Sequence, residues 1–79
     1  MKLGALDFRY RTMGAVSVRS QLDTGENVGV TLDITPFRKY AYWLNGKRVL
    51  PFGSKSASAK YLPMYAELVK AVVNYEEKK

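Results

Sequence analysis

The sequence predicts an α+β domain: a four- to five-stranded antiparallel meander sheet with one C-terminal amphipathic helix packed on one face. Residues 6–12, 16–22 and 28–34 each alternate apolar with polar side chains, which is the period of half-buried strands. Residues 61–75 instead repeat apolar side chains at helical spacing. Because 79 residues are few, we expect residues 1–79 to form a single domain with one core.

The first two strands are predicted to form a hairpin. In residues 3–12 and 16–22 the even positions are mainly apolar and the odd positions mainly polar, so the even side chains should face the core. A three-residue loop at residues 13–15 keeps both apolar faces on the same side of the sheet. This register places Arg9 directly opposite Arg19, a like-charge pair that an anion or a carboxylate would stabilise.

A third strand is predicted after residues 23–27, a polar segment with the composition of a hairpin loop. The even positions from Val28 to Ile34 are all apolar and would form its core face. The strand is expected to end near Pro36, because proline has no N–H to donate to a neighbouring strand.

The dipeptide Asn45-Gly46 is the most specific local signal in the chain, because it lies between two apolar-rich segments and favours a type I′ hairpin turn. A two-residue loop sets these residues opposite one another: Leu44 and Lys47, Trp43 and Arg48, Tyr42 and Val49, Ala41 and Leu50, Lys39 and Phe52. Alternation then separates two faces. The core face would carry Tyr40, Tyr42, Leu44 and Val49. The outer face would carry Lys39, Trp43, Arg48, Leu50 and Phe52.

The C-terminal helix is preceded by a connector at residues 53–58, whose serines are candidate N-caps. Pro63 disfavours helical backbone at the preceding residue and lacks a donor, so the regular helix should begin near it. We expect the helix to run to about Glu76 and to lie across the even face of the sheet.

The composition favours binding over catalysis. The chain has no cysteine and no histidine, so it lacks a thiol nucleophile, an imidazole base and the ligands of an ordinary zinc site. We therefore expect no enzymatic activity, no metal and no cofactor. No apolar segment approaches the roughly 20 residues needed to cross a bilayer, and the N-terminal residues do not form a signal-peptide core. A soluble, unprocessed cytoplasmic protein is expected, and the absence of cysteine fits a reducing compartment.

The charge is strongly basic, with 13 Lys and Arg against 7 Asp and Glu, a net charge of +6 and a pI near 9.7. Such a charge suits an anionic partner, although it also serves solubility alone. Three groups of side chains are candidate binding sites. The first hairpin contributes Arg9, Arg11 and Arg19. The second hairpin contributes Lys39, Trp43, Arg48 and Phe52, with Lys47 at its turn. The start of the helix contributes Lys55 and Lys60.

Each group has a functional and a purely structural interpretation. Interleaved aromatic and basic side chains suit nucleic acid, because a stacked base contributes about 1–3 kcal/mol and the cations follow the phosphates. Alternatively, the arginines extend into water, Trp43 packs in a small core with Arg48 against it, and Lys55 belongs to a simple capped connector.

The segment from Tyr40 through the Asn45-Gly46 turn to the helix ending near Tyr75 resembles the strand, strand, helix ending of AP2-type and phage-integrase arm-binding domains. Those domains place a three-stranded sheet in the DNA major groove, so the resemblance implies DNA binding through the sheet. It is a resemblance of pattern over about half of the chain, without a diagnostic motif. The N-terminal hairpin and Pro63 depart from it.

These observations predict a small basic nucleic-acid-binding protein that uses an aromatic and basic sheet face, with DNA or RNA as the partner. The alternative is a protein-interaction module or inhibitor, of the kind that phages and mobile elements encode, which docks on an acidic partner protein. Tyrosine, tryptophan and arginine are also the usual hot-spot residues of protein interfaces. A homodimer formed through the edge strands, or through Trp43 and Phe52, is a further expectation.

Overall fold

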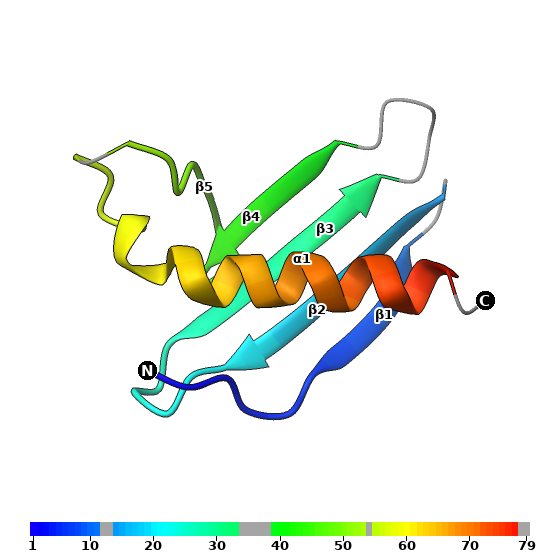
Figure 1. Cartoon of the computed structure of the whole chain (residues 1–79), viewed down its shortest axis with the longest axis horizontal. Coiled ribbons are helices and arrows are strands. Elements are labelled where there is room, and N and C mark those ends of the chain that lie inside the picture. The colour runs from blue at the N-terminus through cyan, green and yellow to red at the C-terminus, as the bar shows by residue number, and fades with distance from the viewer. Residues whose placement is uncertain (12–13, 34–38, 54, 78–79) are drawn as a thin grey trace.

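The computed structural model describes residues 1–11, 14–33, 39–53 and 55–77, and it shows a five-stranded antiparallel meander followed by a C-terminal helix (Figure 1). The elements are β1 (Asp7–Arg11), β2 (Ala15–Gln21), β3 (Asn27–Asp33), β4 (Tyr40–Leu44), β5 (Lys47–Val49), a 3-10 turn η1 (Ala59–Tyr61) and α1 (Leu62–Glu77). The predicted fold class is confirmed. Among the described residues, no helix is both long enough and apolar enough to span a membrane.

The core lies between α1 and the strands β2 and β3. In Figure 1 the helix crosses one face of the sheet over β2 and β3, and no helix of the described residues lies on the opposite face. Even-numbered side chains of β2 and β3 meet three helix residues one turn apart. The fully buried core side chains include Val16, Val18, Val30, Leu32, Tyr65, Leu68 and Val72. The predicted apolar faces of β2, β3 and the helix are therefore confirmed.

The edge strand β1 departs from the prediction. Phe8 is half-buried and stacks on Tyr75 of α1, with ring centroids 4.4 Å apart. Leu6 and Tyr10, however, are exposed, because the helix axis passes over β2 and β3 and only its C-terminal turn reaches β1. The even face of the first strand is therefore only partly a core face.

The predicted register of the first hairpin is wrong by two residues. Arg9 lies opposite Ser17, and Arg19 lies opposite Asp7. Arg11 pairs with Ala15, so Gly14 is the last residue before β2, and its φ of 77° is the left-handed conformation that glycine adopts readily. The position of this glycine at the end of the loop, rather than in its middle, sets the observed register.

The N-terminal segment adds a short bridge beside the end of β2 instead of extending β1. Leu3 pairs with Leu22, and the Gly4 amide donates to the Gln21 carbonyl at 2.9 Å. A Cβ on Gly4 would lie 2.7 Å from that carbonyl oxygen, which is too close for any side chain. The continuous strand predicted from residue 3 is therefore interrupted before Asp7.

The second hairpin has the predicted turn. Asn45 and Gly46 have φ values of 51° and 83°, as a type I′ turn requires. Three predicted pairs are confirmed: Leu44 with Lys47, Trp43 with Arg48, and Tyr42 with Val49.

The two outermost predicted pairs of this hairpin, Ala41 with Leu50 and Lys39 with Phe52, are not formed because β5 ends at Val49. Pro51, which follows Leu50, lacks the N–H that would extend the ladder.

The helix begins as predicted, with Pro63 as the second residue of α1, but the capping prediction is wrong at the start of η1. Ser58 precedes η1 without a side-chain capping bond. Instead, the hydroxyl groups of Ser56 and Ser58 both donate to the Leu50 carbonyl, at 2.7 and 3.3 Å, and so attach the connector to the end of the sheet. The predicted contribution of Ile34 and the predicted break at Pro36 lie outside the described residues.

Candidate functional site

A single row of side chains crosses all five strands on the face opposite α1, which we call the helix-free face. Residues that pair directly across antiparallel strands project from the same side of a sheet. The pairs Asp7–Arg19, Arg19–Gly29, Gly29–Trp43 and Trp43–Arg48 therefore form one continuous row. The register brings Arg19 of the first hairpin and Trp43 of the second onto neighbouring positions of one surface, separated only by a glycine.

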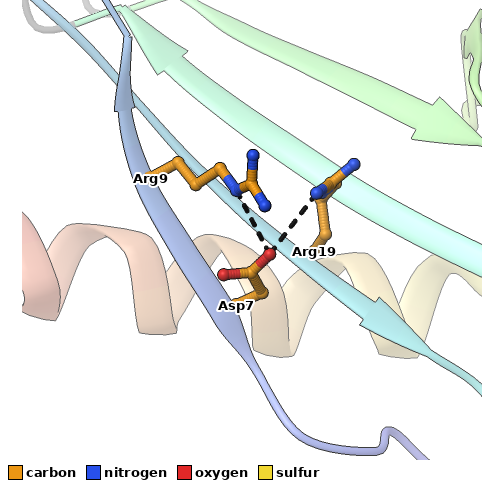
Figure 2. Close-up of polar contacts among 3 residues, drawn as sticks. All are labelled: Asp7, Arg9 and Arg19. Atoms are coloured by element: carbon orange, nitrogen blue, oxygen red, sulfur yellow. Dashed lines mark hydrogen bonds and ion pairs between the residues drawn. The ribbon is translucent and has the colours of Figure 1, made fainter.

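A carboxylate lies between Arg9 and Arg19 of the first hairpin. Asp7 Oδ2 accepts hydrogen bonds from Arg9 Nε at 3.3 Å and from an Arg19 guanidinium nitrogen at 3.4 Å (Figure 2). All three side chains are more than half exposed, so water and salt screen these ion pairs and each contributes little to stability. Asp7 therefore reduces the repulsion between Arg9 and Arg19. A bound phosphate group could take its place.

Trp43 is held in a fixed position on the helix-free face. Its indole N–H donates to Thr31 Oγ1 at 3.1 Å, and because Thr31 belongs to β3 the indole leans from β4 across its neighbour. On the other side of the sheet, the Tyr65 hydroxyl donates to the Trp43 carbonyl at 3.0 Å. The half-buried ring therefore loses little freedom on binding a ligand.

A groove follows β2 and β3 on this face, with a volume of about 710 Å³. Its floor is the strand backbone at Ser17 and Gly29, two positions with small or no side chains. Asp7 lies on one side of the floor and Trp43 on the other. The groove exists because Ser17 and Gly29 are small, while the neighbouring Arg19 and Trp43 side chains are large.

The other predicted residues are distributed around the sheet. Arg11 pairs with Ala15 at the end of β1, and its side chain lies outside the described structure. Lys39 is exposed just before β4, and its carbonyl accepts from the Asp33 amide at 2.9 Å. Lys47 pairs with Leu44 and so shares the helix-covered face at the hairpin turn.

Phe52 and Lys55 lie away from the helix-free face. The Phe52 ring packs edge-on against Tyr42 at 5.5 Å, and both line a small apolar pocket of about 330 Å³ with the start of α1. The prediction that Phe52 and Trp43 share a face is therefore wrong, since β5 ends before Phe52. Lys55 is exposed in the connector between β5 and η1.

Sequence reasoning missed three residues of this site: Asp7, Gly29 and Thr31. Gly29 carries a usable signal, since glycine inside a strand often marks a close approach of other groups. Asp7 is found only with the correct hairpin register, and the Trp43–Thr31 bond depends on the pairing of β3 with β4. The described residues contain no cluster of three or more metal-ligating side chains.

Comparisons with protein-family models, with curated proteins and with solved structures gave no match.

Proposed function

We propose that this is a cytoplasmic nucleic-acid-binding protein that uses the helix-free face of its sheet. The observation that carries the proposal is the row Arg19, Gly29, Trp43 and Arg48, in which a fixed indole lies between two arginines. Guanidinium groups pair with phosphates through two parallel hydrogen bonds, and an aromatic ring stacks on any base. A net charge of +6 adds attraction for a polyanion.

A second candidate is an acidic protein partner, which the arginines and the central tryptophan of this face also suit. A carboxylate between two arginines gives the surface mixed charge, and mixed charge with a central tryptophan is also typical of protein interfaces. In that case oligonucleotides would bind only weakly and would lose nearly all affinity at physiological salt.

Fluorescence anisotropy of labelled oligonucleotides across a salt series tests the proposal. Arg48→Ala should weaken binding to all base sequences alike and flatten the slope of log affinity against log salt by about 0.7–0.9, because one phosphate contact is lost. Trp43→Ala should weaken binding by about 1–3 kcal/mol with little change in that slope.

Lys70→Ala provides a matched control, because Lys70 is exposed on α1 and also carries one positive charge. It should bind like the wild type apart from a small general charge effect. Binding no tighter than the micromolar range at low salt, or equal losses for Arg48→Ala and Lys70→Ala, would refute the proposal.

A further inference from the structure

We infer that the groove above Gly29 is a subsite for one unpaired base of a single-stranded nucleic acid, stacked on Trp43. This inference rests on the proposed function and specifies which form of nucleic acid the surface takes. Three features support it: the width of the sheet, the shape of the groove and the amide side chains at one end of the groove.

The five-stranded sheet as a whole is wider than a groove of B-DNA. Neighbouring strands lie about 4.8 Å apart, so the five strands seen side by side in Figure 1 span about 19 Å before side chains are added. The major groove of B-DNA is about 12 Å wide and admits a helix or a two-stranded ribbon. A duplex on this face would present mainly its phosphates, whereas an unpaired base can turn toward the sheet.

The groove is large enough to hold a base. Its volume of about 710 Å³ is within the range of about 300–1,000 Å³ for small-molecule sites. A Cβ built on Gly29 would lie 3.2 Å from Arg19 Cγ and 3.8 Å from Trp43 Cβ. The side chains of Arg19 and Trp43 therefore project on either side of Gly29, so that a base on the indole has a guanidinium nearby for its phosphate.

Amide side chains line the end of the groove that lies near the β2–β3 turn and the β4–β5 turn. Asn45 Oδ1 accepts from the Asn27 amide N–H at 2.9 Å, and Gln21 Nε2 donates to the Gly25 carbonyl at 3.3 Å. All three residues are exposed, and these two bonds do not use the Asn45 NH₂ group or the Gln21 side-chain carbonyl oxygen. Paired donors and acceptors of this kind bind the hydrogen-bonding edges of bases.

The test compares three ligands of equal length: a single-stranded oligonucleotide, its duplex and an abasic strand with the same phosphates. Trp43 is the single tryptophan of the chain, so its emission reports directly on the groove. The single strand should bind about tenfold or more tightly than the other two ligands and should quench Trp43 emission. Equal affinities, or tighter binding of the single strand with unchanged emission, would overturn the inference while leaving the proposed function intact. No binding of any ligand would instead refute the proposed function.

Two variants test the contacts. Asn27→Ala should bring single-strand affinity toward that of the abasic strand without changing the salt slope, whereas Asn74→Ala, exposed on α1, should have no effect. Thr31→Val removes the acceptor of the indole N–H at nearly constant volume, and it should reduce both quenching and single-strand affinity by several-fold while abasic binding is unchanged. Melting curves like that of the wild type confirm folding. Folded Asn27→Ala and Thr31→Val proteins that bind single strands like the wild type would contradict the inference.

Discussion

Replacing Asp7 with Asn removes the negative charge between Arg9 and Arg19 while conserving the size of the side chain. In the native protein the two guanidinium groups lie 3.3 and 3.4 Å from the same Asp7 oxygen. If the helix-free face binds phosphates, this carboxylate competes with the ligand for both arginines. Asp7→Asn should therefore bind nucleic acid more tightly than the wild type.

The expected magnitudes follow from the exposure of the three side chains. Each exposed ion pair contributes about 0.2–1 kcal/mol, so the loss of both should cost about 0.4–2 kcal/mol of stability, with roughly 4–8 °C in melting temperature for each kcal/mol. If one or two of the released guanidinium groups contact phosphates, the slope of log affinity against log salt should become steeper by about 0.7–1.4. A gain of about 0.7–1.4 kcal/mol in binding corresponds to a three- to tenfold higher affinity at low salt.

The assay is anisotropy of a labelled single strand, with Glu67→Gln as the matched control. Glu67 is exposed on α1, away from the groove, and its substitution produces the same change in net charge. Equal gains for Asp7→Asn and Glu67→Gln would show that only net charge matters. A lower affinity of Asp7→Asn would refute the idea that Asp7 competes with the ligand for the arginines. It would indicate that Asp7 itself contacts the partner.

The remaining predictions concern the scaffold. Leu68→Ala should lower the free energy of unfolding by about 2–5 kcal/mol in denaturant titrations, because Leu68 is fully buried, whereas Leu50→Ala at an exposed site should change it little. Burial raises the pKa of Tyr65 to about 12, above its ordinary value near 10. The protonated hydroxyl therefore stabilises the fold below pH 10, and this contribution is lost between about pH 10 and 12. In thermal melts at successive pH values, Tyr65→Phe should lose less stability than the wild type over that pH range. Equal losses in the two proteins would contradict the role given to the Tyr65 hydroxyl. A homodimer through the sheet edges or exposed aromatics remains a prediction, which sedimentation showing a monomer at tens of micromolar would exclude.

Local signals predicted much of the fold. Alternation located the three N-terminal strands, and the Asn45-Gly46 turn defined the register of the second hairpin because both positions need positive φ. Alternation determines which face a residue occupies, but it cannot distinguish registers that differ by two residues. The position of Gly14 in its loop determines that choice, and with it whether Arg19 faces Arg9 or Asp7.

The candidate site was less predictable because it depends on pairing between strands that are distant in sequence. The arginines and Trp43 were identified by type, but their common row requires the pairings of β2 with β3 and of β3 with β4. Gly29 and Thr31 acquire their roles only from these pairings. Phe52 was misplaced because the ladder ends before it, at a position that the alternation of side chains does not reveal.

Chemical shifts of the backbone amides and of the Trp43 indole N–H, followed during titration with a single-stranded oligonucleotide, would locate the binding surface. If the helix-free face binds nucleic acid, the largest shifts should occur at Arg19, Gly29, Thr31 and the indole N–H of Trp43. Amides on the exposed side of α1, such as Glu67, should shift little. Shifts confined to α1 or to the apolar pocket around Phe52, with the Gly29 and Trp43 signals unchanged, would contradict the account.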